Sequence, residues 1–236
     1  MLHRFSFTLW PTVFTIPVLA VLLGLGVWQL ERLEWKTALI ATFDVRVSAP
    51  PVSPPETVSD IEEWRFRKLQ LEGEFLHEKE VMVTGKPFEG TAGFHVITPM
   101  RLNDGRTVLV NRGWIPEKLR NRADRPASLP TGRVVLEGLL REDRRRGYFV
   151  PDNEPANEVW MYVDTAEIAS HRALGPVAGY VIDALREPGP YRLPIGASDR
   201  ITVRNEHLQY AVTWFLLALT LVAVYLTYHY RRAGND

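Results

Sequence analysis

The chain has 236 residues, a length that suits one soluble domain with membrane segments better than two large domains. Its 28 Lys and Arg balance its 28 Asp and Glu, so net charge gives no reason to expect nucleic acid as a partner. The absence of cysteine excludes thiol nucleophiles, thiolate metal sites and disulfide bonds.

The first predicted element is an apolar helix near the start of the chain. No charged residue occurs from Ser6 to Leu30, and such a stretch can cross the roughly 30 Å hydrocarbon core of a bilayer. We therefore predict a transmembrane helix over 8–30. The stretch is longer than that of a signal peptide and lacks an A-x-A-like cleavage site, so we expect an uncleaved anchor. Beyond this stretch, apolar residues recur at spacings of three and four residues, which predicts that the helix continues to about residue 48.

Small residues mark one face of this first helix. Ala20 and Gly24 are four residues apart, and Gly26 lies nearby. This spacing lets a second membrane helix approach closely. The alternative interpretation is that glycine is simply frequent in membrane helices.

A proline-rich segment over 49–60 follows, and its composition is typical of a stiff, extended linker. Residues 61–203 then read as a β-rich soluble domain, because short runs of β-branched and aromatic residues alternate with turn signals. The predicted strands are Trp64 to Leu71, Glu80 to Thr84, Phe94 to Thr98, Thr107 to Val110, Arg133 to Leu140, Val159 to Val163 and Gly179 to Leu185. Asn103-Asp104-Gly105 is the clearest hairpin turn. Helices are expected around Glu117 to Asn121 and from Asp164 to Arg172.

The second membrane helix is predicted over 207–229, followed by a cytoplasmic tail over 230–236, because no charged residue occurs from Leu208 to Tyr228. Two crossings place both termini on one side of the membrane and the β-rich domain on the other. The antiparallel pair also brings Trp28-Gln29 and Arg32 to the depth of His207 and Tyr210. The predicted fold is thus a membrane protein with two transmembrane α-helices flanking a β-rich (α+β) extracytoplasmic domain, an antiparallel barrel or sandwich.

A histidine begins the second membrane helix. At about 100° per residue, His207 shares a face with Ala211, Trp214 and Ala218. One interpretation is an interfacial polar anchor. The other is a ligand or metal site, because neutral imidazole is the commonest metal ligand in proteins and a usual axial ligand of haem iron. Trp214 and the nearby Tyr210 do not decide between these, since aromatic belts are expected at this depth.

Motifs for catalysis are missing from the sequence. There is no G-x-S-x-G, H-E-x-x-H, Walker loop or G-x-G-x-x-G after a strand, and the six histidines lack metal-ligand spacing. We therefore do not predict an enzyme. Arg112, in Asn111-Arg112-Gly113-Trp114, has two interpretations: a clamp for an anion such as a propionate, or a side chain that ties a loop.

Sequence blocks spread over nearly the whole chain resemble the Surfeit-locus-one (Shy-type) family of cytochrome c oxidase assembly factors. The blocks that carry the resemblance are Leu25-Gly26-Val27-Trp28-Gln29 with Arg32; Gly73-Glu74-Phe75 with His77; Phe94-His95-Val96-Ile97-Thr98-Pro99; Val108 to Pro116; Phe149 to Asn153 with Pro155 and Trp160; and Arg204 to Trp214.

The resemblance implies assistance in building the haem a and copper core of the oxidase's catalytic subunit rather than catalysis. Bacterial members are described as binding haem a, and the histidine that heads the second span is the proposed iron ligand; it corresponds to His207 here. Met161 stands where the family commonly has another histidine, so this chain lacks that candidate second axial ligand. With His207 as the iron ligand, the resemblance and the position at the lipid boundary suggest that Trp214 and Tyr210 contact the haem ring.

Three arginines are candidates to meet the haem propionates: Arg32, Arg204 and Arg112. The resemblance further implies as partners the catalytic subunit of cytochrome oxidase, other oxidase assembly or haem a synthesis factors, and membrane lipid. The expected location is a bacterial inner membrane with both termini cytoplasmic and the domain periplasmic, or the mitochondrial equivalent. The alternative hypothesis is a purely structural chaperone of the catalytic subunit that binds no haem.

Overall fold

The computed structural model describes residues 8–85, 87–143, 147–186, 192–199 and 205–232. The chain forms two compact units: a helix pair, from Met1–Thr42 and Thr202–Asp236, and a β domain, Phe43–Ile201. The predicted class is confirmed, because two apolar helices flank a β-rich domain.

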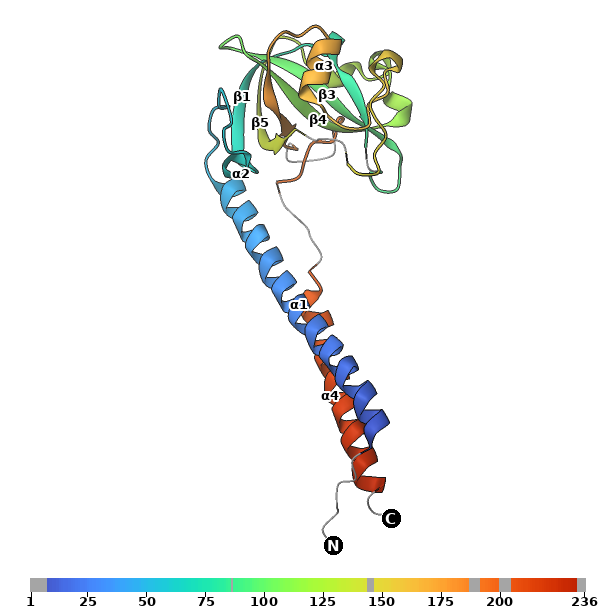
Figure 1. Ribbon diagram of the computed structural model, residues 1–236. Coiled ribbons are helices and arrows are strands. Elements are labelled where there is room, and N and C mark those ends of the chain that lie inside the picture. The colour runs from blue at the N-terminus through green and yellow to red at the C-terminus, as the bar shows by residue number, and fades with distance from the viewer. Residues whose placement is uncertain (1–7, 86, 144–146, 187–191, 200–204, 233–236) are drawn as a thin grey trace. The chain divides into compact units, whose positions relative to one another are not determined.

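The β domain contains a closed barrel of five strands (Figure 1). Its sheet consists of β1 (Lys68–Phe75), β2 (Val81–Thr84), β3 (Gly93–Leu102), β4 (Thr107–Pro116), β5 (Arg133–Glu142) and β6 (Val177–Ala184). The barrel follows the order β1-β5-β6-β4-β3 and closes where the end of β3 pairs with β1. β2 pairs with the other half of β3. The pairing of β4 with β6 is parallel, and the remaining pairings are antiparallel.

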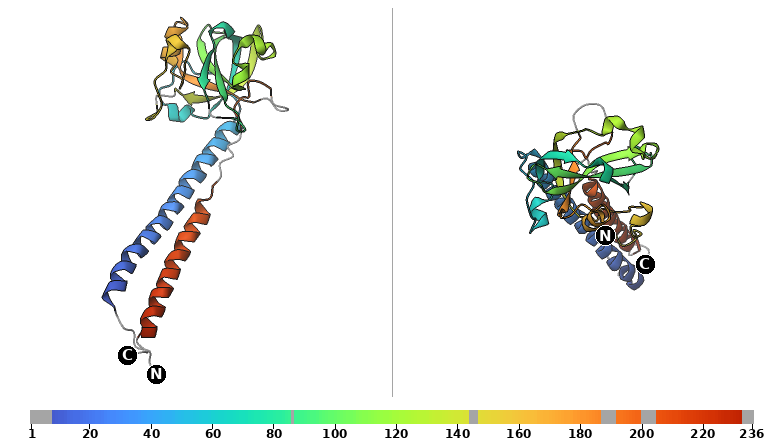
Figure 2. Two further views of the ribbon diagram at one scale, coloured as in Figure 1. Left: turned by 90° about the vertical axis from the view of Figure 1, so that its right-hand side faces the viewer. Right: turned by 90° about the horizontal axis from the view of Figure 1, so that it is seen from above.

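Two clusters of apolar side chains cover the two faces of these strands. One cluster includes Leu71, Met100 and Leu140, and every second residue of β1 is buried because strand side chains alternate. The other cluster contains two fully buried side chains, Trp160 and Ile168. Ile168 belongs to α3 (Thr165–His171), which lies beside the strands (Figure 2). Asp164 caps α3 by accepting from the N–H of Glu167, as the sequence predicts.

Short helices precede the first strand or connect the later ones. They are α2 (Ile61–Trp64), η1 (His77–Lys79), η2 (Glu117–Leu119), η3 (Arg122–Asp124), η4 (Pro126–Ser128) and η5 (Pro155–Asn157). The turn at Asn103-Asp104-Gly105 joins β3 to β4 as predicted, with Gly105 at φ 88°.

The proline-rich segment is bound to the domain rather than running free as a linker. Val52 pairs with the start of β1, donating to the carbonyl of Lys68 at 3.1 Å. The carbonyl of Pro55 accepts from the Tyr180 hydroxyl and from Arg106, both at 2.7 Å. These bonds hold the segment against the barrel.

Two predicted strands are wrong in part. Trp64 ends the α2 turn, whose first residues are capped by Asp60, and Phe66 has a φ of 63°, so β1 begins only at Lys68. The segment Val159 to Val163 forms isolated bridges instead of a strand. Its N–H groups at Met161 and Tyr162 donate to the side chain of Asn153, which takes the place of a neighbouring strand.

The helix pair consists of α1 (Leu9–Ser48) and α4 (His207–Arg232), which lie side by side and antiparallel (Figures 1 and 2). Both are long and apolar enough to cross a membrane, and only 6% and 11% of their most apolar windows are buried. The core helix of a soluble protein would be mostly buried, whereas these helices expose their apolar side chains, as membrane-spanning helices do. Where α1 approaches α4, Gly26 faces the ring of Phe215.

Candidate functional site

His207 is the first residue of α4, at one end of the helix pair. Its side chain is half-buried, and its Nδ1 lies 2.7 Å from Oε1 of Gln29 on α1. The two residues are 178 positions apart in the chain. The antiparallel arrangement predicted from two crossings therefore does bring Gln29 to the depth of His207.

In the structure the Gln29 amide turns its oxygen toward the imidazole, and this orientation sets where the proton lies. An amide oxygen only accepts, so Nδ1 of His207 must donate. In neutral imidazole the lone pair then lies on Nε2. Within the described part of the chain, Nε2 of His207 has no hydrogen-bond partner. Metal-bound histidines have this arrangement, with one nitrogen toward the metal and the other donating to an oxygen.

The face of α4 that carries His207 packs against α1. Ala211 and Ala218 on this face are almost fully buried. The indole Nε1 of Trp214, two turns beyond His207, is buried and has no hydrogen-bond partner among the described residues. Tyr210 is 51% exposed, so its ring lies outside the seam between the helices. The structure thus places Trp214 on the histidine's side of α4 and Tyr210 away from it.

Of the three candidate propionate arginines, only Arg32 belongs to the described part of the helix pair. Its guanidinium is exposed and lies 4.6 Å from the ring centroid of Trp35. It lies one helical turn beyond Gln29 in the sequence. Arg204 lies outside the described residues, and Arg112 belongs to the β domain.

Arg112 is buried and bonded within the β domain. One of its Nη atoms donates to the carbonyl of Ser128, the other lies 3.4 Å from Nδ1 of His77, and its guanidinium covers the ring of Phe75 at 4.8 Å. Burial lowers the pKa of Arg112 to about 10. Burial, with the charge of Arg112 beside the ring, also lowers the pKa of His77. Arg112 therefore ties the end of β4 to the loop at Ser128, and its role as a propionate clamp stays a prediction.

The donor set around His207 fits a haem better than a bare metal ion. Among the described residues, no group of three or more His, Asp or Glu gathers in a metal-binding arrangement. A porphyrin supplies four of the iron ligands itself, so one imidazole nitrogen is sufficient to attach it. The half-buried imidazole of His207 is the polar group that such a ligand would meet, whereas the indole nitrogen of Trp214 is buried in the seam between the helices.

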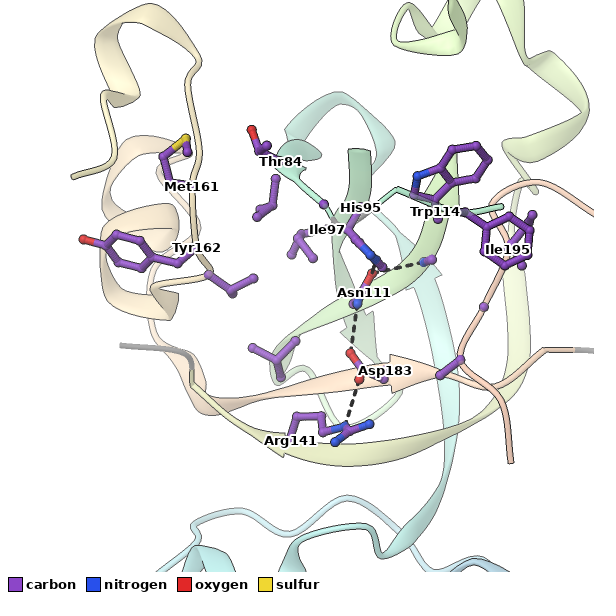
Figure 3. A pocket seen from close by; sticks show the side chains of 18 of the residues that line it. Thr84, His95, Ile97, Asn111, Trp114, Arg141, Met161, Tyr162, Asp183 and Ile195 are labelled. Atoms are coloured by element: carbon purple, nitrogen blue, oxygen red, sulfur yellow. Dashed lines mark hydrogen bonds and ion pairs between the residues drawn. The ribbon is translucent and has the colours of Figure 1, made fainter. Parts of the chain in front are cut away.

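A separate cavity of about 830 Å³ opens on the outer face of the barrel (Figure 3). Apolar and aromatic side chains line most of it, including Ile97, Trp114 and Tyr162. Few precisely placed polar groups on largely apolar walls are typical of small-molecule pockets. This cavity is a second candidate site, in the β domain.

A row of hydrogen bonds runs along the wall of this cavity, over four adjacent strands (Figure 3). Arg141 Nε and Asn111 Nδ2 both donate to the carboxylate of Asp183, each at 2.9 Å. The Asn111 Oδ1 accepts from the N–H of Gly113 at 3.1 Å and faces Nδ1 of His95 at 3.3 Å. Because Asp183 orients the amide, neutral His95 carries its proton on Nδ1.

Sequence reasoning missed this row. His95 and Asn111 occur in the family blocks, but nothing in the sequence singles out Asp183. Arg141 begins a charge run whose pattern predicts a solvated turn, whereas the structure places it in β5 and bonds it to Asp183. Strand alternation could place each side chain on the outer face, since a strand has a period of two. Their meeting also requires the strand order β5-β6-β4-β3, which no local pattern contains.

The fold and the helix pair define a membrane protein in which two apolar helices flank a closed β-barrel domain. The model of the SURF1 family matches residues 16–219. The chain therefore belongs to the SURF1 family, which confirms the family indicated by the sequence blocks.

Several relatives are similar over most of the chain. A SURF1-like protein of Monosiga brevicollis is 37% identical over 94% of this chain and 88% of its own length. Surfeit locus protein 1 of Homo sapiens is 36% identical over 90% of this chain and 74% of its own length. The protein of the same name from Rattus norvegicus is 35% identical over 89% and 72%.

Proposed function

We propose that this protein is an assembly factor for a haem–copper oxidase that binds haem a and assists its insertion into the catalytic subunit. Family membership supports the role in oxidase assembly. The observation that carries the haem part is the 2.7 Å bond from Nδ1 of His207 to Gln29, because it leaves Nε2 as the basic nitrogen of a half-buried imidazole.

In this proposal His207 is the axial ligand of the haem iron. The haem, when bound, supplies the iron and an apolar ring with two carboxylates. Trp214, half-buried on the same side of α4, contacts the ring with the exposed part of its indole, and Arg32 offers a guanidinium to a propionate. The protein's own contribution is to bind and orient the ring rather than to carry out a reaction.

The partners and the location follow from the same proposal. We expect contact with the catalytic subunit of the oxidase, with other assembly or haem a synthesis factors, and with membrane lipid. The membrane would be a bacterial inner membrane, with both termini cytoplasmic and the β domain periplasmic, or its mitochondrial equivalent. Arg32 and Lys36 on the domain side do not set this topology, because long domains translocate largely regardless of charge.

Haem a titration of the purified protein in detergent tests the proposal. The wild type is expected to give a saturable absorption change that His207→Ala loses. His171→Ala, at a histidine of the β domain that contacts Glu158, is the matched control and should bind as the wild type does. If His207→Gly also loses the signal, imidazole added to the solution should restore it. Equal haem binding by the wild type and His207→Ala would overturn the proposal.

A second candidate function, a purely structural chaperone of the catalytic subunit, is favoured by one surface feature. Tyr148 and Phe149 are 97% and 96% exposed, and their rings pack on each other at 5.7 Å. Exposed aromatic pairs are typical of protein contact surfaces. Pull-down of the catalytic subunit from cells that make no haem a separates the two functions. The chaperone requires the complex to survive there and to be weakened by Tyr148→Ser with Phe149→Ser.

A further inference from the structure

Gln29 is the side chain that meets His207 across the helix pair. It comes from the long apolar stretch of α1, where an amide is costly unless it is hydrogen-bonded. Its oxygen lies 2.7 Å from Nδ1 of His207, a short bond for a nitrogen donor. The amide is half-buried, whereas Gln209, two residues after His207, is exposed.

The position of the proton on His207 decides which nitrogen can bind a metal. Imidazole by itself prefers to carry its proton on the nitrogen farther from the backbone, which would leave Nδ1 basic. Nδ1 of His207 points to α1, so a basic Nδ1 would face Gln29 instead of a ligand. The amide oxygen of Gln29 reverses that preference, because it accepts only from a protonated Nδ1.

We propose that Gln29 is a positioning residue that holds His207 in the Nδ1–H form and so makes Nε2 the iron-binding nitrogen. This inference rests on the proposed function for its haem readout, whereas the haem-free protein tests the proton position by itself. Partners of this kind orient the ring and make the metal-bound nitrogen more basic. Removing such a partner typically weakens metal affinity by about 10- to 100-fold.

The first measurement is made without haem. Nitrogen-15 NMR of histidine-labelled protein in detergent, at a pH where imidazole is neutral, distinguishes the two tautomers. The His207 signals are assigned by their loss in His207→Ala. We expect the Nδ1–H form in the wild type and in Gln29→Glu, which keeps an accepting oxygen. Gln29→Leu should shift His207 to the Nε2–H form, and the matched control Gln209→Leu should leave it unchanged.

The second measurement is haem a titration of the same variants. Gln29→Leu should weaken binding by about 10- to 100-fold, Gln29→Glu should restore it, and Gln209→Leu should have no effect. A wild-type His207 in the Nε2–H form, or a Gln29→Leu variant with unchanged tautomer or unchanged affinity, would overturn the inference. Haem binding that survives His207→Ala would instead overturn the proposed function. The tautomer measured by NMR would be unaffected, because that experiment is made without haem.

Discussion

A histidine of α4 bonds across the helix pair at each end, His207 to Gln29 of α1 and His229 to Thr8 just before α1, but the two imidazoles are used differently. His229 is fully buried, and its Nδ1 donates to the carbonyl of Tyr225 at 2.8 Å. Its Nε2 must then accept from the hydroxyl of Thr8, also at 2.8 Å. His207 is half-buried and uses only Nδ1, toward Gln29.

This difference separates a structural histidine from one that can bind a ligand. The two positions are 229 − 207 = 22 residues apart, or about 33 Å along a helix, close to the roughly 30 Å thickness of a hydrocarbon core. With the helix pair across a bilayer, each histidine would lie near one boundary of the apolar layer. At the His229 end both ring nitrogens are occupied by the helices themselves, whereas at the His207 end one nitrogen remains for an added group.

The largest expected contrast is in chemical reactivity. Diethyl pyrocarbonate acylates neutral imidazole nitrogens, so we expect rapid modification of His207 and protection of His229, read by mass spectrometry of peptides. His229 can react only when the helix pair opens. Even an opening cost of about 2 kcal/mol would slow its reaction roughly thirtyfold. Added haem a should protect His207. Equal rates at both histidines would contradict the comparison.

The next contrast is in the stability of the helix pair. His229→Leu removes one bond across the pair, to Thr8, and one within α4, to the carbonyl of Tyr225. Only the first holds the helices together, and such a bond contributes about 0.6 to 1.7 kcal/mol in membrane proteins. We expect a loss of about 1 kcal/mol, with haem affinity unchanged. His207→Leu also removes one bond across the pair and should cost less, because His207 is half-buried whereas His229 is fully buried.

Fluorescence resonance energy transfer can measure these costs. Because the chain has no native cysteine, dyes can be attached at introduced cysteines alone. Labels on Leu9→Cys and Leu226→Cys, both exposed positions, report separation of the helices as a denaturing detergent is added. A greater loss from His207→Leu than from His229→Leu would show that the two ends have been assigned the wrong way round.

The sequence predicted those parts of the fold that depend on local patterns. The two helices follow from long runs without charge, and the hairpin follows from Asn103-Asp104-Gly105, because each signal is complete within a short segment. The depth at which Gln29 meets His207 also followed, since an antiparallel pair of known span allows only one depth.

Other features depend on contacts that no short segment contains. The Asn111 to Asp183 bond requires the parallel pairing of β4 with β6. Glu80 has the polarity of a surface residue, but it is buried in an ion pair with Arg125. The contact face of α1 was equally hidden, because the helix is apolar on nearly all sides. Of the small residues that the sequence offered for close approach, Gly26 meets the ring of Phe215, whereas a Cβ on Gly24 would meet nothing within 4 Å.

The smallest expected effect distinguishes these glycines and shows how the His207 end is held. A Cβ on Gly26 would lie 2.6 Å from the ring of Phe215, so Gly26→Ala must displace that ring, at a cost of about 1 kcal/mol. Gly24→Ala is the matched control and should be neutral or slightly stabilising, since alanine favours a helix more than glycine does.

The same fluorescence assay measures both glycine variants, and Phe215→Leu combined with Gly26→Ala should recover the lost stability by removing the ring edge. Gly26 lies one helical turn before Gln29, so a close approach there keeps the amide within reach of His207. If Gly26→Ala and Gly24→Ala behave alike, packing does not hold this end. The His207 end would then depend on the Gln29 bond, and Gln29→Leu should separate the helices as readily as His229→Leu does.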